Sequence, residues 1–134
     1  MATDPWAKAG LMVRQSTEAG SVHATIVATA SNGYLFGHRN RTNALTDGSK
    51  GGPAPFPSAW LRLTREGRTV RAHRAVDGAG KRFEPLGQPL ILNATDPVLL
   101  GLCVTAHTNE KLTLAEFCEV SGLVRGDAAA GSRR

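Results

Sequence analysis

Arginine and histidine are concentrated in one stretch of the sequence, WLRLTREGRTVRAHRAVDG at 60–78, which holds six of these side chains around a single Glu-Gly pair. An aromatic ring beside cationic donors can stack on the face of a sugar while guanidinium groups bind its hydroxyls. The same donors can bind a phosphate or a carboxylate. A hairpin that turns at Glu66-Gly67 would place these side chains on one face of a sheet, as the cross-strand pairs Arg62 with Arg71 and Trp60 with His73.

This polar face also has a purely structural interpretation. Like charges directly opposite one another repel, so we expect Arg62 to be a buried or half-buried member of an ion pair with an acid from a neighbouring strand. Trp60 would then pack under the loop at 41–58, and Arg71 would be the residue least explained by packing. Tyr34 and His38 would flank the ligand-binding face if they are exposed. Both interpretations stay open at this point.

Alternating apolar and polar residues, interrupted by turn signals, predict the strands that position these side chains. Three hairpins are expected: one over SNG at 31–33, one in 59–76, and one over TNE at 108–110 that joins 97–107 to 111–123. Apolar residues at helical spacing never extend beyond a turn or two. The pattern favours an all-β antiparallel sandwich or barrel. We expect one domain over 1–123 and a flexible polar tail at 124–134. The strands are expected at 8–16, 22–30, 34–40, 59–66, 68–76, 89–92, 97–107 and 111–123.

The bulk composition narrows the class of protein. A chain of 134 residues is long enough to bury a core without disulfides. Its net charge of +5 serves solubility and attracts acidic partners only weakly. There is no apolar run of the roughly 20 residues that a membrane helix needs, and MATDPWAKAG has no export-signal pattern. Cys103 and Cys118 are too few for a disulfide framework, and free thiols are expected.

Other chemistries find little support. Glu116 and Glu119, the one close pair of acids on an expected strand, would point to opposite faces, and no nucleophile elbow occurs. The four histidines lie on separate strands without metal-ligand spacing. Loop calcium would rest on isolated turn acids, so no cofactor or metal is expected. Nucleic acid is not expected as a partner, because binding would need a basic stripe interleaved with exposed aromatics, and alternation assigns Tyr34, Phe36 and Phe117 to the core. The turn acids considered for calcium are Asp47, Asp77 and Asp96. Because none of these chemistries finds support, the chain is expected not to be an enzyme.

Four motifs follow one another along the chain: WAKAGLMVR at 6–14, the stretch at 60–78, VLLGLCVTAH at 98–107 and FCEV at 117–120. Together, and in this order, they resemble the concanavalin A-like (laminin G-like) jelly-roll domains of bacterial multidomain secreted proteins. The resemblance covers about 6–121, with Phe83 where a tryptophan is common. The matching residues are Trp6, Lys8, Gly10, Met12, Arg14, Trp60, Arg62, Arg65, Gly67, Asp77, Gly78, Gly101, Thr105 and His107.

The resemblance implies a jelly-roll sandwich that is secreted or lies in the cell envelope and binds carbohydrate or mediates adhesion without catalysis. Its contacts would be Trp60, Arg62, Arg71 and His73. Family domains carry several strands before the first motif, whereas this chain starts almost at it, and an open sheet edge is an aggregation hazard. The alternative is therefore a structural or assembly subunit that completes its sandwich through a partner chain or a homodimer.

Overall fold

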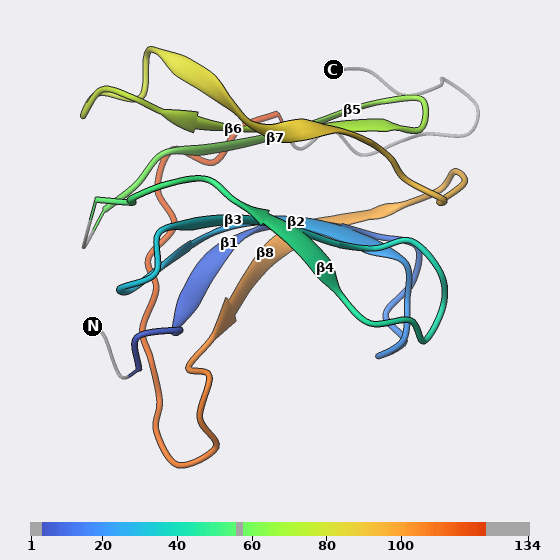
Figure 1. The fold of residues 1–134 in the computed structure, drawn as a ribbon, viewed down its shortest axis with the longest axis horizontal. Coiled ribbons are helices and arrows are strands. Elements are labelled where there is room, and N and C mark those ends of the chain that lie inside the picture. The colour runs from blue at the N-terminus through green and yellow to red at the C-terminus, as the bar shows by residue number, and fades with distance from the viewer. Residues whose placement is uncertain (1–3, 56–57, 123–134) are drawn as a thin grey trace.

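The computed structural model describes residues 4–55 and 58–122, and in these ranges the chain forms eight β-strands and no helix. A five-stranded antiparallel sheet, sheet A, has the order β4-β3-β2-β1-β8, and a three-stranded antiparallel sheet, sheet B, has the order β5-β6-β7. The two sheets pack face to face (Figure 1). The predicted all-β sandwich is confirmed. The strands are β1 (Lys8–Arg14), β2 (His23–Thr29), β3 (Tyr34–Arg39), β4 (Asp47–Lys50), β5 (Leu61–Glu66), β6 (Thr69–Ala75), β7 (Phe83–Ile91) and β8 (Leu99–Thr105).

The core lies between the sheets because every second residue of each strand points inward. On sheet A the cross-strand register aligns apolar residues of β1, β2 and β3, so that Leu11, Ile26 and Phe36 form one row across the sheet. Sheet B contributes Val70 and Leu86, which are 0% and 1% exposed. The opposite faces carry mostly polar and half-buried residues, with Val27 of β2 as a buried apolar exception, and these faces and the sheet edges are candidate binding surfaces.

The β5–β6 hairpin forms, but its register differs by two residues from the predicted one. Glu66 pairs with Thr69, so the turn residues are Gly67 and Arg68. Gly67 has a φ of 59°, in the left-handed region that the first central residue of such a turn requires, and a glutamate there would be strained. Because the shift is an even number of residues, the polar and apolar faces stay as predicted. The direct Arg62–Arg71 and Trp60–His73 pairings are wrong: Arg62 lies across from His73 and Thr64 across from Arg71.

The third predicted hairpin does not form. β8 pairs along its whole length with β1, and no strand occurs in 111–122. Cys103 consequently lies across from Gly10, and both cysteines are free thiols. A further strand, β4, lies inside the region 41–58 that was expected to be loop. The expected tail at 124–134 lies outside the described residues. No helix long and apolar enough to span a membrane occurs in 4–55 or 58–122.

Candidate functional site

The outer face of sheet B carries the arginines that the sequence singled out. Arg62 and Arg71 are both exposed. The Arg62 guanidinium carbon lies 4.0 Å from the centroid of the Phe83 ring, a cation–π contact, and Arg62 forms no ion pair with any described residue. The ion pair predicted for Arg62 is therefore wrong. His73 lies half-buried between the two arginines. Burial lowers the pKa of its ring, and the charges of Arg62 and Arg71 lower it further.

Trp60 is half-buried just before β5, and its carbonyl accepts a hydrogen bond from the Ala75 amide at 3.1 Å. Its ring packs on the turn between β6 and β7. A Cβ atom added at Gly80 would lie only 2.2 Å from a ring carbon, and the φ of Gly80 is 68°. Asp77 holds the same turn, because its carboxylate accepts hydrogen bonds from two backbone amides, at 3.0 and 2.9 Å. Trp60 therefore packs against the β6–β7 turn.

Tyr34 and His38 do not join the face of sheet B. Both lie on the inner face of sheet A, across from Ala28 and Ala24 of β2. Tyr34 is 1% exposed in the core, so it does not meet the exposure condition on which its role as a flanking contact was predicted. His38 lies on the same face of β3, near the other end of the strand, and is half-buried. The sequence-predicted set is thus divided between two faces of the molecule.

The edge of sheet A at β8 is open. No described residue pairs with the outer edge of this seven-residue strand, whose sequence, LLGLCVT, contains no charge and no proline. The register with β1 puts Leu100, Leu102 and Val104 on the inner face, in line with the core residues Val13 and Leu11. These three β8 side chains are nevertheless 45–51% exposed. The core surface of sheet A thus continues past the part that sheet B covers.

A cleft of about 710 Å³ lies beside this open edge. Its walls come from the inner side of β1, from β5 and from the irregular segment 113–121, and Val104 of β8 also lines it. Figure 1 shows this last segment, in orange to red, running from below sheet A up to the level of sheet B. The sandwich is therefore closed on this side by irregular chain, with much apolar surface left uncovered.

The outer face of sheet A holds a second concave surface, which the sequence analysis did not identify. It is a groove of about 500 Å³. At one end of it, Trp6 lies within 5.9 Å of two lysine ammonium groups, those of Lys8 and Lys50, and its ring centroid is 6.5 Å from that of His107. The alternation of Lys8, Gly10 and Met12 in β1 was the signal that could have indicated one side of this groove. Lys50 gave no such signal, because β4 lies in a region of turn-forming residues.

In the ranges that the structure describes, no three histidine, cysteine, aspartate or glutamate side chains group as metal ligands would. Comparison with protein-family models, with curated proteins and with solved structures found no match to this chain.

Proposed function

We propose that this chain is a non-catalytic assembly module that forms a homodimer through the β8 edge. The observation that carries the proposal is the combination of an unpaired, uncharged strand edge with apolar inner-face side chains left half exposed. Natural proteins protect such edges with charges, prolines or covering segments, because free N–H and C=O groups otherwise pair with other chains. Exposed contiguous apolar surface marks interaction sites by the same reasoning.

A second copy of this chain is the partner that suits the edge best. Two β8 strands related by a two-fold axis would pair antiparallel, each presenting the same residues to the other. LLGLCVT contains no charge that would be brought against its own copy in this arrangement. Pairing would join two five-stranded sheets into one continuous sheet and bring the inner-face leucines of both copies together.

The dimer predicts a definite mass in solution. Light scattering on the purified chain should give twice 14.1 kDa. Leu102→Lys should reduce the mass to that of a monomer, because an inward-pointing charge on an edge strand opposes pairing. Since Leu102 is 45% exposed, the monomer can accommodate the lysine. Leu112→Lys, at a 92% exposed position outside β8, is the matched control and should remain dimeric. A chain that is monomeric at every concentration tested would overturn the proposal.

The outer face of sheet B is the second candidate, as a carbohydrate-binding surface. The observation that favours it is that Arg71 is exposed and forms no ion pair with any described residue, beside Arg62 and half-buried His73. A glycan array should then show a bound sugar whose signal Arg71→Ala weakens about tenfold, the loss expected for one hydrogen bond to a charged group. Arg82→Ala, an exposed arginine just before β7, should keep the signal. Absence of any bound glycan would contradict this second function.

A further inference from the structure

The groove on the outer face of sheet A has an apolar floor. In β1, β2, β3 and β8 the residues that point away from sheet B come together there, because paired strands keep their alternation in register. Burial raises the pKa of the Cys103 thiol, so this side chain stays uncharged at neutral pH. Figure 1 shows residues 106–112 and the β3–β4 connection extending below sheet A on either side of this face. The apolar side chains of the floor are those of Met12, Val27, Leu35 and Cys103, and Thr25 and Gly37 lie among them on the same face.

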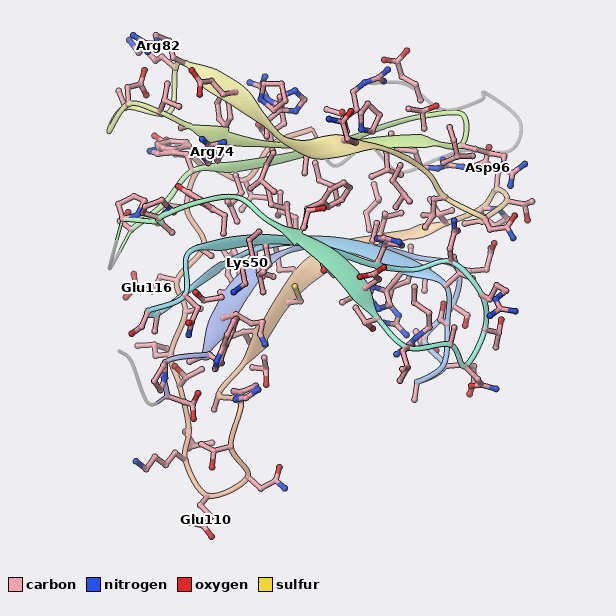
Figure 2. The ribbon with its side chains drawn as sticks, viewed as in Figure 1. Lys50, Arg74, Arg82, Asp96, Glu110 and Glu116 are labelled. Carbon is pink, nitrogen blue, oxygen red and sulfur yellow. The ribbon has the colours of Figure 1, made fainter. Side chains whose placement is uncertain are left out.

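Two lysines without acidic partners lie at the rim of the groove. Lys8 and Lys50 line it, and neither forms an ion pair with a described residue. Each ammonium group is 5.9 Å from the centroid of the Trp6 ring. Figure 2 shows Lys50 on the side of sheet A that faces away from sheet B. Asp47 is the one acid among the lining residues, and its carboxylate accepts a hydrogen bond from the Gly48 amide at 2.8 Å. The rim therefore carries a net positive charge.

His23 adds an independent polar feature to the same groove. Its side chain lines the groove and is 7% exposed. The ring Nε2 lies 3.4 Å from the Thr46 hydroxyl, whereas Nδ1 is buried and has no hydrogen-bond partner among the described residues. A buried polar atom without a partner costs free energy, and in native proteins such atoms often mark places where a ligand or an ion completes the bonding.

We propose that this groove binds a small organic anion that has one carboxylate and an apolar body. Lys8 and Lys50 would pair with the carboxylate, and the hydrocarbon part would cover Met12, Val27 and Leu35 of the floor. A volume of about 500 Å³ and an apolar lining with a few polar groups are typical of sites for such ligands. A free sugar fits less well, because its hydroxyls would face Met12, Val27 and Leu35 without hydrogen-bond partners. The groove shares β8 with the proposed dimer edge, through Cys103, Val104 and Thr105, but the binding proposal does not depend on dimerisation.

Calorimetric titration of the full chain with three probes tests the proposal. Octanoate has both the charge and the apolar body, octan-1-ol has the body alone, and acetate has the charge alone. Octanoate should bind with a saturable heat, and the other two should bind at least about tenfold more weakly, since each lacks one of the two contributions. Equal binding of octanoate and octan-1-ol would overturn the proposal, as would the absence of octanoate binding.

Variants locate the binding to this groove. The double variant Lys8→Gln with Lys50→Gln should weaken octanoate binding about tenfold or more, the loss expected for charge-assisted contacts. Lys81→Gln, at an exposed lysine in the β6–β7 turn, should leave it unchanged. Leu102→Lys changes the apolar β8 edge and should also leave it unchanged. If Leu102→Lys abolishes octanoate binding and the double lysine variant does not, octanoate binds at the β8 edge and the groove proposal is wrong.

Discussion

Replacing Gly10 by alanine is expected to lower the free energy of unfolding by about 3 kcal/mol, at the upper end of the cost of overpacking. Gly10 is buried in β1, between β2 and β8. A Cβ atom at this position would lie 1.9 Å from the carbonyl oxygen of Ile26 and 2.7 Å from the Cα of Val27. Both are backbone atoms in the middle of the sheet, which cannot rotate away as a side chain would. The methyl group must therefore push β1 and β2 apart.

Gly101 provides the matched control, because it lies in β8, the other neighbour of β1, and has nothing within 4 Å of an added Cβ. Gly101→Ala should leave stability unchanged or raise it slightly, since alanine restricts the unfolded chain more than glycine. Urea unfolding of the two variants and the parent measures the difference. Equal stabilities of the two alanine variants would mean that β1 and β2 do not approach as closely as described.

These two glycines also illustrate what the sequence can predict. Both lie in the motifs from which the sequence predicted a family resemblance, yet one is packed against backbone and the other faces open space. A motif identifies a glycine but does not say which neighbour excludes a side chain there. That information comes from the pairing of β1 with β2 and β8, which involves residues far apart in the chain.

Strand faces were predicted better than strand partners. Alternation alone assigns Leu63 and Val70 to the core and Arg62 and Arg71 to the surface, and a two-residue change of register leaves these faces unaltered. Partner choice is decided by distant chain. β8 was expected to pair with the segment that follows it, but pairs with β1 instead. An open edge was anticipated near Trp6, but this location is wrong: β1 is paired on both sides, with β2 and β8, and the open edge is at β8.

The candidate groove could not be predicted from the sequence, for a related reason. Lys8 and Met12 share a face of β1 by simple alternation, so one wall could have been found. Lys50 and Thr46 come from the β4 region, where glycine, proline and serine conceal the strand. His23 reads as an ordinary strand histidine, and only the three-dimensional structure shows that it is enclosed and lies near Arg39 and Arg14.

Acid is expected to destabilise the protein through His23. Burial, together with the smaller effects of the charges of Arg39, Arg14 and His38, lowers the pKa of this ring from 6.5 to about 4. Both arginines are held in place by backbone carbonyls: Arg39 Nη1 donates to the Ala19 carbonyl at 2.7 Å, and Arg14 Nε to the Ser16 carbonyl at 2.9 Å. The positive charges near the ring are therefore fixed, and they oppose its protonation.

The pH range follows from the two pKa values. Above pH 6.5 the ring is neutral in both the folded and the unfolded chain, and the free energy of unfolding does not depend on its titration. Between pH 6.5 and about 4 the unfolded chain binds a proton that the folded chain does not, so the free energy of unfolding decreases as the pH is lowered. The full difference of about 2.5 pKa units corresponds to about 3 kcal/mol and is reached below pH 4.

Urea unfolding of the parent and of His23→Gln across this range measures the contribution. Glutamine at position 23 does not titrate, so the stability of the variant should fall less as the pH is lowered from 6.5 to 4. The difference in unfolding free energy between the two proteins should change by up to about 3 kcal/mol from its value at neutral pH. His107→Gln, at a ring with 49% exposure, should keep the loss seen in the parent. Parallel profiles for the parent and His23→Gln would show that the ring takes up its proton equally well in the folded and unfolded chains. In that case His23 would not be enclosed between fixed arginines, and the unpartnered nitrogen that supports the groove proposal would be accessible to water.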